Sequence, residues 1–224
     1  MATLPGARRV AWRPLGALVA ASFVLASCGG AQYEYVKSDD DKAFFKVPIS
    51  WEEYGKRELL VATGQSLSAA TDEGFPWLVG YDGDPDPSLD HVLELGGAPE
   101  HPVILAQVRR LDFSTRDQIS LGTLRNVFYE VDTLLQENAA DIIDYEELAL
   151  PDGLRGIRMV FDVITAGATT IAADNTVIRV GQVGVLDAKT ENLYVFTIRC
   201  ESHCYRDNET VIEQIVDSWT VKER

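Results

Sequence analysis

The polar residues with the most suggestive spacing form the acidic segment Asp82–Asp90 (Asp-Gly-Asp-Pro-Asp-Pro-Ser-Leu-Asp). Its first carboxylates alternate as the oxygen ligands at positions 1, 3 and 5 of a calcium loop do. The rest of that pattern is missing, because Pro87 replaces the glycine and Glu94 comes one position after the bidentate glutamate of such loops. Aspartate and proline are also typical of turns. We therefore predict a solvated turn and no metal site, and the alternative candidates for binding a cation are Asp82, Asp84, Asp86 and Asp90.

Acid–base chemistry near neutral pH would need a histidine, and the chain has His91, His101 and His203. Because His91 and His101 both fall in the acidic, Pro-rich loop region, one hypothesis joins them to Asp82–Asp90 in a catalytic site. The other hypothesis is that they are surface histidines in loops. The chain has no Gly-x-Ser-x-Gly, no phosphate-binding glycine loop and no His-Glu-x-x-His. A pair of carboxylates for glycoside hydrolysis is a further alternative, because the 35 acidic residues offer many combinations. We predict no catalytic residues and no cofactor.

The N-terminus has the construction of an export signal. Three arginines precede the uncharged segment Leu15–Leu25, and small residues follow it. Eleven residues are too few for a transmembrane helix, which needs about 20. The ending Leu25-Ala26-Ser27-Cys28 resembles the lipobox of bacterial lipoproteins. The resemblance implies cleavage before Cys28, a thioether-linked diacylglyceryl group and N-acylation, for example with palmitate. The alternative is an uncleaved apolar helix with Cys28 as an ordinary thiol.

Lipidation of Cys28 would leave Cys200 and Cys204, an even number of cysteines in an oxidising compartment. We predict that they form a disulfide, which joins the end of a strand to the start of the last helix. A metal site formed with His203 is the competing idea, but a structural zinc needs a fourth ligand and none lies nearby. A redox pair would have two residues between its cysteines and this pair has three.

The charge of the chain limits its partners. The sequence has 20 basic and 35 acidic residues, and removal of residues 1–27 would leave 17 basic residues and a net charge of −18 (17 minus 35). Nucleic acid is an unexpected partner, since such binding depends on Lys and Arg. An anionic membrane surface is disfavoured for the same reason. The charge indicates solubility and self-repulsion, or recognition of a cationic partner or divalent ion.

After cleavage we expect a flexible tether over residues 28–42 and a single domain over residues 43–224. Strands are predicted from alternating or continuous apolar residues, and helices from apolar residues on one face. The predicted helices are 51–61, from the capping-box spacing of Ser50 and Glu53, then 121–136 and one that begins at Asn208. The predicted strands are 43–49, 76–81, 103–111, 142–150, 156–164, 176–186 and 193–200. The alternation of apolar residues with Arg158 and Asp162 in 156–164 indicates a sheet covered mainly on one face. Gly181 and Gly184 in 176–186 indicate a bulge or the close approach of something flat. This pattern indicates an α+β fold, an antiparallel sheet with two or three helices packed on it.

Two segments resemble the PsbP-like sandwich, which includes subunit P of the photosystem oxygen-evolving complex and surface lipoproteins of the LpqN type. They are the early Phe45-Lys-Val-Pro-Ile-Ser-Trp51 and the late Ile215-Val-Asp-Ser-Trp-Thr-Val221. The disulfide pair and the acidic segment do not match that family. The resemblance implies a binding or assembly module and transfers no catalytic residues.

We therefore predict a lipid-anchored protein on the extracytoplasmic face of the cell membrane that is not an enzyme. It would bind another envelope protein, or a small apolar ligand between sheet and helices, and no nucleic acid. The alternative is an envelope hydrolase or calcium-dependent enzyme that uses Asp82–Asp90.

Overall fold

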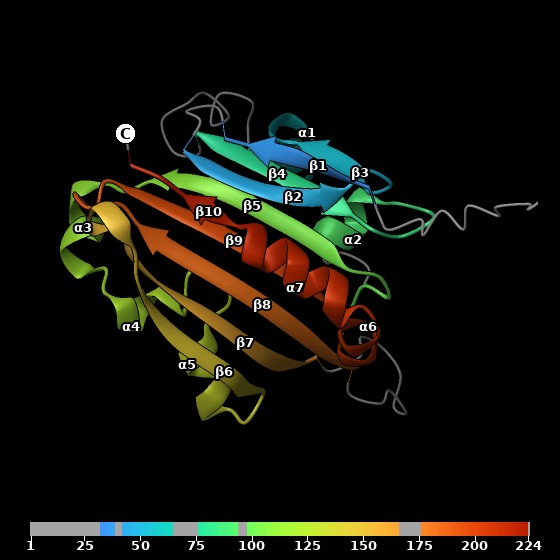
Figure 1. Ribbon diagram of the computed structural model, residues 1–224. Coiled ribbons are helices and arrows are strands. Elements are labelled where there is room, and N and C mark those ends of the chain that lie inside the picture. The colour runs from blue at the N-terminus through green and yellow to red at the C-terminus, as the bar shows by residue number, and fades with distance from the viewer. Residues whose placement is uncertain (1–31, 39–41, 65–75, 94–97, 166–175, 224) are drawn as a thin grey trace, which may run out of the picture. The chain divides into compact units, whose positions relative to one another are not determined.

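The computed structural model describes residues 32–38, 42–64, 76–93, 98–165 and 176–223. Within these residues it contains strands, short helices and one 3-10 turn, Pro151–Gly153 (Figure 1). The strands are Tyr33–Lys37 (β1), Ala43–Pro48 (β2), Glu52–Gly55 (β3), Trp77–Asp82 (β4), Val103–Arg110 (β5), Ala140–Ala149 (β6), Arg155–Thr165 (β7), Thr176–Leu186 (β8), Asn192–Glu201 (β9) and Thr220–Val221 (β10). The helices are Lys56–Ala62 (α1), Leu89–Leu93 (α2), Phe113–Gln118 (α3), Leu121–Leu124 (α4), Val131–Gln136 (α5), Ser202–Asp207 (α6) and Glu209–Ser218 (α7). The predicted α+β class is confirmed, with more and shorter helices than expected.

All strand pairs of the described residues are antiparallel, and they form two sheets. The large sheet has the order β3-β4-β5-β9-β8-β7-β6, and the small one has the order β1-β2-β10. Strand β9 lies in the middle of the large sheet, and its residues Leu193 to Cys200 are buried on both faces. A strand that is buried on both faces indicates a sheet covered on both sides, and here the buried residues include Thr197 and Arg199 as well as apolar ones.

One face of the large sheet is covered by the small sheet, α6 and α7. Phe45 of β2 is central to this layer, because its ring lies 5.3–6.3 Å from four other aromatic rings. These rings come from three different parts of the chain, so their packing joins strands β2, β4 and β9 to the C-terminal segment. They belong to Trp77, Tyr81, Phe196 and Trp219.

The opposite face of the large sheet is covered by other helices. Leu124 of α4 and Val131 of α5 are fully buried against apolar side chains of β7, β8 and β9. Leu59 and Leu60 of α1 pack with Val92 of α2 against the β4 end of the sheet. The chain therefore places one helical layer behind the sheet and, in front of it, a layer made of a second sheet and α7 (Figure 1).

The predicted tether over residues 28–42 is wrong for Tyr33–Lys37, which form β1 and pair with β2 along their whole length. Tyr33 and Val36 pack against the core, and the Tyr33 hydroxyl donates a 2.8 Å hydrogen bond to Gln214 Oε1. Pairing with β2 and the half-buried side chains of Tyr33 and Val36 thus hold a segment whose charges and glycines suggested flexibility. Residues 28–31 and 39–41 lie outside the described residues.

The predicted helix over 51–61 is wrong in its first half. Residues Glu52–Gly55 form β3, which pairs with β4. Glu53 does not form a capping box with Ser50, because its carboxylate accepts a 2.9 Å hydrogen bond from the Tyr81 hydroxyl. The helix begins after Gly55, whose N–H donates to Glu58 Oε2 at 2.9 Å. Partners distant in sequence therefore outweigh the local capping signal.

The predicted helix over 121–136 is broken into α4 and α5. The first piece, α4, ends at Leu124. Asn126 holds the start of the second piece: its Oδ1 accepts from the Asp132 N–H at 3.0 Å, and its Nδ2 donates to the Asp132 carboxylate at 2.8 Å. Side-chain bonds of this kind compete with the helical ladder. The apolar face that suggested one helix is still buried in part, through Leu124 and Val131.

Candidate functional site

The acidic segment is built around Asp82, the last residue of β4, which is completely buried. Its Oδ1 accepts a hydrogen bond from the Asp84 N–H at 2.9 Å, and its Oδ2 accepts one from the Ser88 N–H at 2.8 Å. His91 Nδ1 of α2 lies 2.8 Å from the same Oδ2. The carboxylate therefore holds the turn and the start of α2 together, as aspartate commonly does in turns.

Burial and the charge of Asp82, in that order, raise the pKa of the nearby Tyr54 hydroxyl above its ordinary value. Tyr54 is the third residue of β3, the strand that pairs with β4. The Asp82 carboxylate therefore affects the ionisation of a side chain on the neighbouring strand β3, in addition to holding the turn.

Of the other carboxylates of the segment, that of Asp84 has its own partners. Asp84 Oδ1 accepts from the Asp86 N–H at 2.8 Å, and Asp84 Oδ2 lies 3.9 Å from His101 Nε2. Asp84, Asp86, Asp90 and His91 border a cavity of about 610 Å³. Across the described part of the chain, no three His, Cys, Asp or Glu side chains come together as a metal site. Asp82, the first candidate ligand, uses both of its oxygens within the protein.

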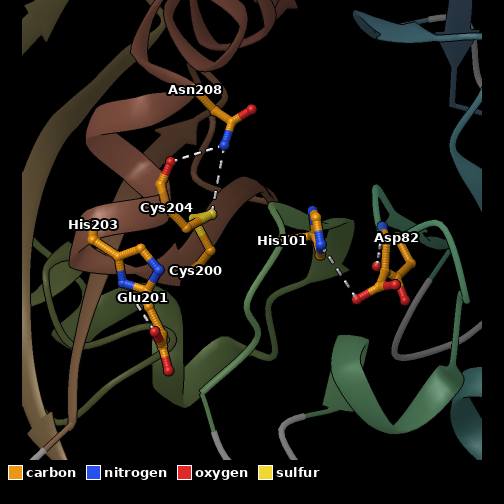
Figure 2. Close-up of a disulfide and its surroundings, with 8 residues drawn as sticks. Asp82, His101, Cys200, Glu201, His203, Cys204 and Asn208 are labelled. Carbon is orange, nitrogen blue, oxygen red and sulfur yellow. Dashed lines mark hydrogen bonds and ion pairs between the residues drawn. A yellow bond between two sulfur atoms is a disulfide. The ribbon is translucent and has the colours of Figure 1, made fainter.

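Cys200 at the end of β9 and Cys204 in α6 form a disulfide. Figure 2 shows it beside Asn208, whose Nδ2 donates to the Cys204 carbonyl at 2.9 Å. His203 is turned to Glu201, with Nδ1 3.0 Å from Oε2. The sulfurs are bonded to each other and are not thiolate ligands. The predicted disulfide is present, but it joins the central strand to α6, the helix before the last one, and not to the start of the last helix.

The described residues also form a pocket whose lining residues the sequence did not identify. It has a volume of about 490 Å³ and lies between the C-terminal end of α7, β10 and strands β6–β8. We call it the apolar pocket, because most of its lining is apolar. Its apolar lining residues are Leu148, Leu150, Leu154, Val183, Val185, Val216, Trp219 and Val221. A concave site of this size and character is typical of ligand binding.

A second, more polar pocket of about 240 Å³ continues along the N-terminal part of α7, and we call it the polar pocket. The two pockets share Arg158 and Val216. The Arg158 guanidinium donates to the Asp217 carboxylate at 2.7 Å, so this ion pair stands where they meet. Together the pockets form one groove beside α7, over the face of β7 that carries Arg158 and Val160.

Tyr205 of α6 lines the polar pocket and is only 9% exposed. A Cβ on Gly181 of β8 would lie 2.7 Å from its hydroxyl, so the absence of a side chain there lets the phenol rest on the sheet. Burial raises the pKa of Tyr205 to about 12, against the opposing charges of Arg158 and Arg179. Within the described residues no group forms a hydrogen bond to this hydroxyl.

Sequence reasoning missed this groove because its residues are far apart along the chain. The alternation of Ile157, Met159 and Phe161 with Arg158 and Val160 suggested a strand with one solvated face. The structure places that polar face beside α7, where it forms one wall of the groove. The glycine in strand 176–186 was the usable signal, since it indicated a close approach to the sheet, which Tyr205 makes.

Cys28 and the Leu25-Ala26-Ser27-Cys28 ending lie outside the described residues. In the described ranges, the helices are too short or too polar for any of them to cross a bilayer.

No protein-family model matches this sequence, and no curated protein matches it. Among solved structures the chain is similar to cyanobacterial PsbP (CyanoP) of Synechocystis sp. PCC 6803, with 13% identity, a TM-score of 0.48, and coverage of 88% of this chain and 99% of that one. It is similar to LpqN of Mycobacterium tuberculosis, described as involved in cell envelope biogenesis, with 15% identity, a TM-score of 0.42 and coverage of 86% and 91%. It is also similar to the Ran-binding protein Mog1p of Saccharomyces cerevisiae, with 8% identity, a TM-score of 0.44 and coverage of 86% and 96%. Two of the three are of the PsbP and LpqN types that the sequence resembles, and at these TM-scores none assigns a family or a function.

Proposed function

We propose that this chain is a lipid-anchored lipoprotein of the cell envelope whose extracytoplasmic domain is a non-catalytic binding or assembly module. The observation that carries the binding role is the apolar pocket of about 490 Å³ beside α7. Its lining is dominated by aliphatic side chains and Trp219, which bury apolar surface rather than perform acid–base chemistry.

The anchor is supported by the sequence, through the lipobox-like ending at Cys28. Two acyl chains give stable membrane anchoring, whereas one gives only marginal binding. In the native host, the wild-type protein should partition into the detergent phase, and Cys28→Ser should move it to the aqueous phase. Unchanged partitioning of the variant would remove the lipid anchor from the proposal.

The pocket is tested with Nile red, a neutral apolar dye that fluoresces in apolar surroundings, added to the full chain. Leu150→Ser removes apolar surface from the pocket and should weaken the bound-dye signal several-fold. The matched control is Ile49→Ser, because Ile49 is 54% exposed and does not line the pocket. Equal dye binding by wild type, Leu150→Ser and Ile49→Ser would show that this pocket is not a binding site.

A further inference from the structure

We propose that the groove beside α7 binds a basic amphipathic segment of a partner protein, with its apolar side chains in the apolar pocket and a lysine or arginine in the polar pocket. This inference rests on the proposed binding function and adds the chemistry of the partner. Three features of the groove support it: its charges, the Tyr205 hydroxyl and its length.

The polar pocket holds more negative than positive charge once its ion pairs are counted. Its arginines are Arg158, Arg179 and Arg206. Two of them are already bound to carboxylates outside its lining, Arg158 to Asp217 and Arg179 to Asp162 through two 2.8 Å hydrogen bonds. The carboxylates of the lining itself are Asp144, Glu209 and Glu213.

Within the described residues these three carboxylates form no ion pair. The groups in and around the pocket therefore include five carboxylates and three arginines. A cation fits this arrangement better than an anion does, because an anion would compete with carboxylates already bound to the two paired arginines.

The Tyr205 hydroxyl supplies a second, independent feature. The side chain is about nine-tenths buried, and its hydroxyl has no hydrogen-bond partner in the described part of the chain although it lines the pocket. The hydroxyl oxygen is not one of the buried polar atoms that lack a partner, so it opens into the pocket and is available to a ligand there. A neutral phenol can accept a hydrogen bond from an ammonium or guanidinium group, while Glu209 and Glu213 provide the charge.

The length of the groove favours a protein segment over a small molecule. Its lining extends along α7 from Glu209 to Asp217, a distance of about 12 Å at 1.5 Å per residue. A helix or extended peptide of that length can place aliphatic side chains at one end and a basic one at the other. The strongly acidic chain would also attract a basic partner at long range.

The probes are three fluorescein-labelled 12-residue peptides, measured by anisotropy with the full chain. One has leucines on one helical face and lysines on the other, the second has the same composition in shuffled order, and the third has glutamates in place of the lysines. The leucine–lysine peptide should bind at least tenfold more tightly than either of the others. The shuffled peptide controls for charge alone, and the glutamate peptide for apolar surface alone.

The double variant Glu209→Gln/Glu213→Gln should weaken binding of the leucine–lysine peptide at least fivefold, and Tyr205→Phe should weaken it two- to threefold. The matched control, Glu52→Gln/Asp117→Asn, removes the same charge from exposed positions that line neither pocket. It should change binding less than twofold. An equal loss in both double variants would mean nonspecific attraction and would overturn the proposal.

Two other outcomes separate this inference from the function on which it rests. If Nile red binding depends on Leu150 but the leucine–lysine peptide binds no better than the glutamate peptide, the groove binds apolar ligands and the basic segment is refuted. If dodecylamine binds in a manner that depends on Glu209 and Glu213 while the peptide does not bind, the ligand is a small cationic amphiphile. Absence of binding by every probe would overturn both proposals.

Discussion

Replacement of Asp82 tests whether the acidic segment is a structural turn or a cation site. The buried carboxylate accepts hydrogen bonds from the backbone N–H groups of Asp84 and Ser88 and from His91. Hydrogen bonds to a charged group contribute about 1.5–3 kcal/mol each, and the two backbone donors can partly rehydrate when the acceptor is lost. Asp82→Ala should therefore lower the free energy of unfolding by about 3–5 kcal/mol, which is the loss of these three hydrogen bonds after partial rehydration of the donors.

Asp82→Asn keeps the shape but replaces one acceptor oxygen by an NH₂ group, so it should lower the free energy of unfolding by about 2 kcal/mol. The matched control is Asp86→Ala, since Asp86 is exposed and only its backbone N–H is used in the turn. Its effect should be within about 0.5 kcal/mol. Urea denaturation followed by tryptophan fluorescence and circular dichroism measures all three variants.

The calcium alternative gives the opposite pattern in the same assay. With millimolar calcium chloride, the unfolding midpoint of the wild-type protein should not move. A calcium-dependent increase that disappears in Asp82→Ala would show that the segment is a cation site. The structural account would also be wrong if Asp82→Ala were no less stable than Asp86→Ala.

Three further predictions concern the sheet, the disulfide and the polar pocket. Gly156→Ala should lower the free energy of unfolding by about 3 kcal/mol in a urea titration, because the added Cβ would lie 2.2 Å from the Gly184 carbonyl oxygen. The control Gly122→Ala should be nearly neutral, because its Cβ would have only the Ser120 hydroxyl oxygen nearby, at 3.7 Å. Equal unfolding midpoints for the two variants would contradict this prediction. Cys200→Ser/Cys204→Ser should lower the free energy of unfolding by about 2 kcal/mol under oxidising conditions, which is the value that loop entropy predicts for so short a loop. A reductant should remove the difference between the variant and the wild-type protein. Burial raises the pKa of Tyr205 from 10 to about 12, so the folded state favours the neutral phenol. The resulting contribution to the free energy of unfolding is complete below pH 10 and is lost as the pH rises to about 12. Between these pH values the free energy of unfolding should fall less steeply in Tyr205→Phe than in the wild-type protein, and parallel curves would refute the pKa shift.

The strands were largely predictable from sequence because their signal is local. The alternation in residues 156–164 and the mainly apolar composition of residues 193–200 depend only on which faces of a strand are buried. The final helix from Asn208 was predictable for the same reason, since Ile212, Ile215 and Val216 share one helical face and are buried.

Segments whose conformation depends on distant partners were not predictable. Glu53 lies in a strand because β4 pairs with its backbone and Tyr81 binds its carboxylate. Tyr33 lies in a strand because β2 and Gln214 hold it, against a composition that suggested a tether. The helix over 121–136 is broken by a side-chain bond between Asn126 and Asp132 that periodicity does not register.

The sequence by itself determined the α+β class, the central strands, the strong negative charge and the cysteines that form the bond between β9 and α6. Only the tertiary structure decided that Asp82 is buried within its own turn and that Leu150, Tyr205 and Trp219 line one groove. The physical reason is that hydrophobic periodicity records which side of an element is covered, not which element covers it. A groove forms where α7 leaves part of the β7 face uncovered, and that depends on packing between segments distant in the chain.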